Sequence, residues 1–156
     1  MVSVLRLVGL IGLLNVAVDQ GVAQALLSNA GLLQADGGTV LMSTQAAGQL
    51  LANSVNNTGV LQAQTLENQQ GRIVLLGSSD SGTVNLGGQL DVSGGAGQQG
   101  GSVTALGQHV GLFSAQIDAS GGLGGGVVLI GGGFQGKNPD LPAASLADIG
   151  QLPRVD

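Results

Sequence analysis

The sequence contains no cysteine, no tryptophan and no tyrosine, and only two phenylalanines among its 156 residues. The absence of cysteine excludes disulfide bonds, thiolate metal sites and a cysteine nucleophile. Hydrophobic residues nevertheless make up 43% of the chain, so its core has to be built from valine, leucine, isoleucine and alanine. Stacked short strands suit these residues better than a compact mixed fold does.

Charged residues are also rare, at 8% of the chain, and the net charge is −5 at pH 7. The four basic residues are Arg6, Arg72, Lys137 and Arg154. They provide no cationic surface that could neutralise a phosphate backbone, so we expect no nucleic-acid partner. The length fits a single domain with its own core.

Residues 1–18 are almost entirely apolar and allow two interpretations. They can form the first coil of a repeat structure, or they can belong to a signal peptide, since Ala23-Gln24-Ala25 has the small-x-small form of a cleavage site. A single arginine and the interrupting glycines favour the first coil. The run is shorter than the ~20 apolar residues of a membrane-spanning helix. Residues 20–29 form the one stretch in which we expect a short helical turn.

The sequence repeats itself from Asn29 onward. Gly-Leu-Leu-Gln-Ala at residues 31–35 returns as Gly-Val-Leu-Gln-Ala 28 positions later, and residues 89–95 return at 116–122 with five of seven residues identical. A glycine-led apolar strand also recurs, at residues 38–42, 71–76, 101–106 and 126–130. Short strands that recur at a period in the twenties and are separated by turns are typical of a β-solenoid.

Stacked coils place equivalent residues above one another at ~4.8 Å. We predict one interior ladder of Leu33, Leu61, Leu90 and Ile117, and a second of Val40, Val74, Val103 and Val128. Asn29 and Asn57, 28 residues apart, are predicted to stack in a turn. The solenoid is expected to span residues 1–135. Residues 136–156, with three prolines, are expected to form a loop or tail because proline cannot donate to a ladder.

Two stretches match the pattern Gly-x-Gly-x-x-Gly, at residues 95–100 and 131–136. Dinucleotide binding requires that such a motif open a helix. The first match precedes an expected strand and the second a proline-bearing loop, and Gly101 stands where a phosphate-binding loop needs lysine. We therefore predict no cofactor.

Candidate catalytic and metal-binding residues are few. His109 is the single histidine, which excludes a paired-histidine metal site, and Ser114 lacks an orienting acid for a triad. Asp80, Asp91 and Asp118 lie in turn-like sequences of Asp, Ser and Gly. The equivalent positions of Asp91 and Asp118 also resemble the carboxylate pair of a glycosidase or a lyase. No nearby arginine or lysine completes a lyase site, so we predict no catalytic, metal-binding or cofactor-binding residue and no enzymatic activity.

Four segments carry a family resemblance: residues 35–42, 55–59, 71–75 and, most specifically, the glycine-rich run 124–136. They make the chain similar to the filamentous haemagglutinin-type exoproteins of bacterial two-partner secretion systems. The resemblance implies a right-handed, single-stranded parallel β-helix of the pectin-lyase-like type. It also implies export through a partner pore in the outer membrane and a secreted or cell-surface location.

Members of that family are usually far longer and carry Asn-Pro-Asn motifs, whereas this chain has only Asn138-Pro139, so we expect a fragment. The leading hypothesis is a non-catalytic structural and interaction segment of a surface adhesin, acting in cell adhesion or biofilm formation on host or bacterial glycans or proteins. The alternatives are a carbohydrate-active β-helix enzyme and a truncated relic without function. The unpaired ends of a solenoid also predict self-association.

Overall fold

The computed structural model describes residues 8–10, 13–17, 25–44, 53–66, 69–133, 137, 141, 143–150 and 154–155. All regular secondary structure in this part of the chain is β, and it contains no helix. The strands in chain order are β1 (Val8–Leu10), β2 (Leu13–Ala17), β3 (Ala25–Asn29), β4 (Leu32–Gln34), β5 (Thr39–Ser43), β6 (Asn53–Asn57), β7 (Val60–Gln62), β8 (Arg72–Leu76), β9 (Gly82–Asp91), β10 (Ser102–Leu106), β11 (His109–Asp118), β12 (Val127–Ile130), β13 (Leu146–Ile149) and β14 (Arg154–Val155).

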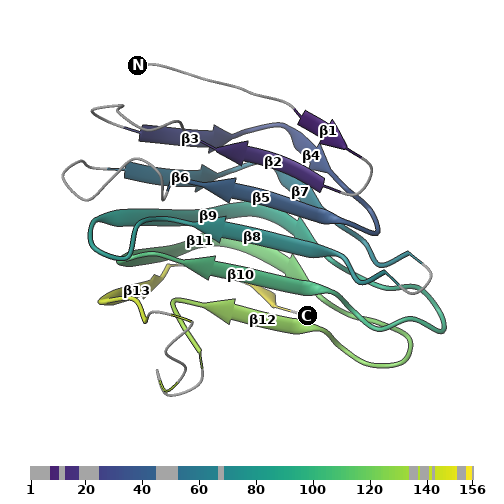
Figure 1. Ribbon diagram of the computed structural model, residues 1–156. Helices are drawn as coiled ribbons and strands as arrows, with labels where there is room; N and C mark the ends of the chain where they lie inside the picture. The colour runs from purple at the N-terminus through teal and green to yellow at the C-terminus, as the bar shows by residue number, and fades with distance from the viewer. Residues whose placement is uncertain are drawn as a thin grey trace.

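The strands form two sheets that the chain visits in turn (Figure 1). The first sheet has the order β1-β2-β5-β8-β10-β12 and the second the order β13-β11-β9-β6-β3, with β4, β7 and β14 attached. These strands pair in parallel, except that β1 is antiparallel to β2. In Figure 1, β2, β5, β8, β10 and β12 run leftward in front and β3, β6, β9 and β11 run rightward behind while the chain descends. The coil is therefore right-handed, and the predicted parallel β-helix is confirmed.

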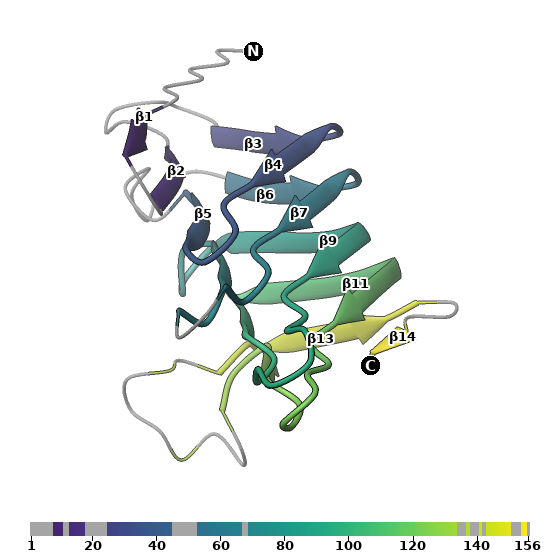
Figure 2. The ribbon, with the colours of Figure 1, turned by 90° about the vertical axis from the view of Figure 1, so that its right-hand side faces the viewer.

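The second sheet covers two sides of each coil. β6 and β7 both pair with the ten-residue strand β9, and β11 follows β9 over the same length. Figure 2 shows β3 and β4, and likewise β6 and β7, meeting at an angle. The first sheet closes the third side, so side chains that point inward from all three sides share one core.

The first predicted interior ladder is confirmed. Leu33 lies beside Leu61, Leu61 beside Leu90, and Leu90 beside Ile117. The last three side chains are fully buried and Leu33 packs against them. Burying each such side chain contributes about 1.5–3 kcal/mol, so this column is a main source of stability.

The second predicted ladder is wrong at one position. Val40 and Val103 lie beside Ile73 rather than Val74, and Val103 lies beside Val128. Ile73 is fully buried, whereas Val74 is partly exposed on the outer face. Successive side chains of a strand point to opposite faces, so a shift of one residue exchanges inside for outside. In each strand the inward-facing member of the ladder is the second residue after the leading glycine, whichever apolar residue stands there.

Two further segments differ from expectation. The short helical turn predicted for residues 20–29 is wrong where it can be compared, because Ala25–Asn29 is strand β3 and pairs with β6, while residues 20–24 lie outside the described residues. The pairing with the next coil overrides local helix propensity. Residues 136–156 are not only loop, since β13 and β14 both pair in parallel with β11.

The glycines that lead β8, β10 and β12 are required by close packing between coils. A Cβ atom at Gly71 would lie 1.4 Å from the carbonyl oxygen of Ala63, and one at Gly101 would lie 2.2 Å from that of Gly71. At Gly126 the distance to the carbonyl oxygen of Gly101 would be 1.8 Å. The neighbouring backbone cannot yield as a side chain can, so this corner admits only glycine.

We predict that Gly101→Ala lowers the free energy of unfolding by at least about 1–3 kcal/mol, because the added methyl group pushes two coils apart. Gly31→Ala is the matched control, since a Cβ atom at Gly31 meets nothing within 4 Å. Its effect should stay within about 0.5 kcal/mol. Urea denaturation followed by circular dichroism measures both changes, and equal stability of the two variants would contradict the close-packed corner.

Candidate ligand-binding groove

The two aspartates singled out in the sequence lie side by side at a corner of the coil. Asp118 pairs with Asp91 in the parallel register of β9 and β11. Oδ1 of Asp91 accepts hydrogen bonds from the backbone N–H (2.9 Å) and hydroxyl (2.6 Å) of Ser93, and its Oδ2 accepts one from the amide of Gln64 (2.6 Å). Oδ1 of Asp118 accepts one from the N–H of Ser120 (2.9 Å). Both carboxylates therefore act as turn-forming groups.

The other residues considered for chemistry lie apart from these aspartates. His109 and Ser114 are exposed on β11, and Asp80 is exposed in the turn between β8 and β9. The glycine run 95–100 forms a tight turn, with the N–H of Gln98 donating to the carbonyl of Gly95 (3.1 Å), and leads into strand β10. In the second run, residues 134–136 lie outside the described residues.

No metal-binding cluster and no membrane-spanning helix is found in the described part of the chain. No three His, Cys, Asp or Glu side chains come together there as metal ligands do. The same residues form no helix that is long and apolar enough to cross a membrane.

The parallel ladder between β9 and β11 is interrupted by a bulge. Leu112 lies beside Leu86 and Ala115 beside Gly88, so the two residues Phe113 and Ser114 stand opposite the single residue Gly87. Ser114 has a φ of 55°, and it is the one described non-glycine residue with positive φ. A bulge of this kind turns a side chain to a new direction. Here it turns Phe113 outward, where 48% of its surface is exposed.

Two glycines provide the surface on which the ring of Phe113 lies. A Cβ atom at Gly111 would be 2.3 Å from Cε2 of the ring, and one at Gly150 would be 2.7 Å from Cδ1. The N–H of Gly150 donates to the carbonyl of Leu112 (2.7 Å), which holds this support against β11. The ring thus rests on backbone and presents its other side to solvent.

A column of polar side chains leads along the outer face of the second sheet to the ring. Ser28, Asn56 and Asn85 are register partners on β3, β6 and β9, and the next two members of the column are Gly111 and Asp148. Because Gly111 has no side chain, the ring of Phe113 covers its place in the column.

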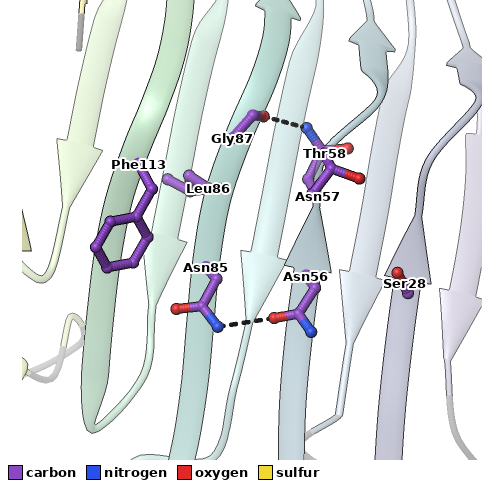
Figure 3. A pocket seen from close by; sticks show the side chains of 8 residues that line it. All are labelled: Ser28, Asn56, Asn57, Thr58, Asn85, Leu86, Gly87 and Phe113. Atoms are coloured by element: carbon purple, nitrogen blue, oxygen red, sulfur yellow. Dashed lines mark hydrogen bonds between the residues drawn. The ribbon is translucent and has the colours of Figure 1, made fainter. Parts of the chain in front are cut away.

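The two asparagine side chains are joined to each other. Nδ2 of Asn85 donates to Oδ1 of Asn56 at 2.8 Å (Figure 3). In Figure 3, Oδ1 of Asn85 points toward the side of Phe113, and Nδ2 of Asn56 points toward the side of Ser28. Among the described residues, this acceptor and this donor have no further hydrogen-bond partner. The pair therefore offers one acceptor and one donor at its two ends.

These residues line two adjoining hollows, which together we name the Phe113 groove. The first has a volume of about 360 Å³ and is lined by Ser28, Asn56, Asn57, Thr58, Asn85, Leu86, Gly87 and Phe113. The second has a volume of about 200 Å³ and is lined by Thr83, Asn85, His109, Val110, Gly111, Phe113, Leu146 and Asp148. Asn85 and Phe113 belong to both. No lysine or arginine is among the lining residues.

The predicted stack of Asn29 and Asn57 is confirmed, and it supports one end of the groove. Nδ2 of Asn29 donates to Oδ1 of Asn57 (2.9 Å) between successive coils. Nδ2 of Asn57 donates in turn to the carbonyl of Gly87 (2.8 Å), the residue opposite the bulge. Both asparagines are buried, so their hydrogen bonds replace those that water would otherwise make.

Comparisons of this chain with protein-family models, with curated proteins and with solved structures find no match.

Sequence reasoning missed the groove, although two signals for it are present. His109 pairs with Thr83 at a spacing of 26 residues, whereas Gln116 pairs with Gln89 at a spacing of 27. The extra residue between these pairs marks the bulge. Phe113 is also one of only two aromatic residues in the chain, and an isolated aromatic beside an insertion is a candidate contact residue.

We predict that Asn57→Ala lowers the free energy of unfolding by about 1–3 kcal/mol, because it removes the shortest hydrogen bond of the Asn29 amide and takes the amide partner from the buried carbonyl of Gly87. Asn56→Ala, at the adjacent outward position, should cost about 0.5 kcal/mol or less. Thermal and urea unfolding of both variants provide the measurement. Equal destabilisation would mean that the buried stack does not support this corner.

Proposed function

We propose that this chain is a non-catalytic structural and interaction segment of a secreted bacterial surface adhesin of the filamentous haemagglutinin type. The observation that carries the proposal is the Phe113 groove: an aromatic ring held outward by a bulge on an otherwise regular solenoid. A buried aromatic would add to the core, whereas this ring lies on the surface beside the Asn56–Asn85 pair, where a partner can contact both. The fold is the one that the family resemblance implies.

The hydrogen bonding of the stacked aspartates favours binding over catalysis. A glycosidase acid or nucleophile has to be free to reach the substrate. Both oxygens of Asp91 accept hydrogen bonds instead, one from Ser93 two residues on and the other from Gln64 of the preceding coil. As part of a longer protein, the segment would leave the cell through the outer-membrane pore of a two-partner system. It would then act at the cell surface in adhesion or biofilm formation, on host or bacterial glycans or proteins.

We expect beads coated with the chain to adhere to bacterial or animal cells, and Phe113→Ala to reduce adhesion by more than half. Leu123→Ala is the matched control, because Leu123 is a large exposed apolar residue outside the groove. Microscopic counting of bound beads measures the effect. Equal adhesion by the two variants would show that the groove takes no part in adhesion. New reducing ends released from a polysaccharide would favour the enzyme alternative.

We also propose that copies of the chain associate through the edge strand β12. In the described part of the chain, β12 has a strand neighbour on one side only, β10. Val128 and Ile130 pack against the core, while Val127 is 55% exposed. The strand contains no charge and no proline, the two features that usually protect an edge from pairing with another copy.

A lysine at the edge should oppose this association. We predict that Val127→Lys shifts the chain toward monomer, because charged edges repel one another, while Leu123→Lys, which adds the same charge outside any strand, leaves association unchanged. Sedimentation velocity over a range of protein concentrations measures the distribution. A monomeric wild-type chain at all concentrations, or equal effects of the two lysines, would exclude β12 as the interface.

A further inference from the structure

The Phe113 groove joins an apolar surface to hydrogen-bonding groups in a single line. The exposed side of the ring is a flat surface with a partial negative charge on its face, which attracts the polarised C–H groups of a ligand. The side-chain oxygen of Asn85, an acceptor, points toward the ring, and the side-chain N–H of Asn56, a donor, follows on the neighbouring strand (Figure 3). A ligand for this line has an apolar C–H face together with groups that both donate and accept.

Hydroxyl groups meet the second requirement, since each can donate and accept. A wholly apolar ligand would cover the free ends of the Asn56 and Asn85 amides and leave them without partners, at a cost in affinity. The hydroxyls of Ser28 and Thr83 extend the same chemistry to both hollows. Strand spacing of ~4.8 Å repeats these groups along the solenoid axis, which suits a ligand that is itself a chain of similar units.

The charge of the groove argues against a charged ligand. No lysine or arginine lines it to hold a sulfate or carboxylate, and the net charge of the chain is −5. A cationic ligand could lie over Phe113 beside Asp148, but Asp148 lines only the smaller hollow. The free N–H of Asn56 in the larger hollow would repel a cation. The groove therefore fits an uncharged ligand best.

We propose that the Phe113 groove binds a neutral polysaccharide, with one pyranose ring stacked on Phe113 and the hydroxyls of neighbouring sugars hydrogen-bonded to Asn85 and Asn56. This proposal rests on the proposed function and names the class of ligand for the same surface. Phe113 supplies most of the affinity, and the two amides select for hydroxyl positions.

The test uses the full chain and a panel of three kinds of probe: neutral hexasaccharides (cellohexaose, a β-1,3-glucan hexamer and chitohexaose), heparin, and a hexalysine peptide. Binding is measured by titration calorimetry and by changes in amide NMR signals. At least one neutral hexasaccharide should bind, with little change between low and high salt, because no ion pair is formed. The NMR changes should centre on residues 85, 111 and 113.

Variants test the two parts of the site separately. Phe113→Ala should weaken binding about tenfold, and Asn85→Ala several-fold. Phe113→Trp should retain it, since an indole also presents an aromatic face, and Leu123→Ala should have no effect. Circular dichroism confirms that each variant is folded. Asn85→Leu, which keeps the bulk of the side chain but removes both polar groups, should weaken binding as much as Asn85→Ala.

Three results would overturn the proposal: no binding of any neutral hexasaccharide, binding that Phe113→Ala and Asn85→Ala leave unchanged, or salt-sensitive binding of heparin or hexalysine in its place. The outcome is separable from that of the bead experiment. Adhesion that depends on Phe113 without saccharide binding would leave the adhesive function standing with another ligand class. Saccharide binding without adhesion would leave a sugar-binding site on a chain that is not an adhesin.

Discussion

Parallel pairing between successive coils constrains the strand residues in the described part of the chain. A spacing of ~4.8 Å places each side chain directly beside its counterpart in the next coil, with the same inward or outward direction. The column from Leu33 to Ile117 shows the result: four residues from four repeats occupy one line of the core. Composition follows from the same constraint, because a column shared by all coils favours side chains of similar, moderate size, such as Val, Leu, Ile and Ala.

The corners obey a stricter version of this rule. At the corner where the chain enters β8, β10 and β12, the backbone of one coil lies very close to that of the next. Gly71, Gly101 and Gly126 therefore have no room for a Cβ atom. At another corner, the amide of Asn29 donates to the side-chain oxygen of Asn57 where water is excluded. The stack ends at the next coil, where Leu86 takes the place of asparagine and the amide of Asn57 turns to the carbonyl of Gly87. A polar column can therefore be short, provided that its last member finds a backbone partner.

Repetition made most of the fold predictable, and departures from repetition made the rest difficult. The solenoid, the first ladder and the asparagine stack follow from offsets of 27 and 28 residues in the sequence. Val74 was chosen over Ile73 by residue type, although position after the glycine decides which side chain faces inward. The prolines of residues 136–156 indicated a loop, yet β13, a strand of four residues between Pro142 and Pro153, stacks on β11. Near the candidate site, His109 and Ser114 were considered for chemistry and rejected. Phe113 and the Asn56–Asn85 pair were missed, because binding surfaces lack the fixed spacing of catalytic motifs.

The bulge at Phe113 shows that the residues that stabilise the fold differ from the residues that the surface offers to a ligand. Inward columns carry the burial that stabilises the coil, so outward columns are free to vary in side-chain chemistry. A regular outward column can offer only what its repeats supply, which here is a line of hydroxyl and amide groups. Adding one residue to β11 changes this, because it turns a ring outward over Gly111 at the cost of about 1–2 kcal/mol for Ser114 at positive φ. That cost is tolerated without loss of the ladder, which resumes at Ala115 beside Gly88. A local insertion thus gives a single point of specificity to a surface that repetition alone would leave uniform.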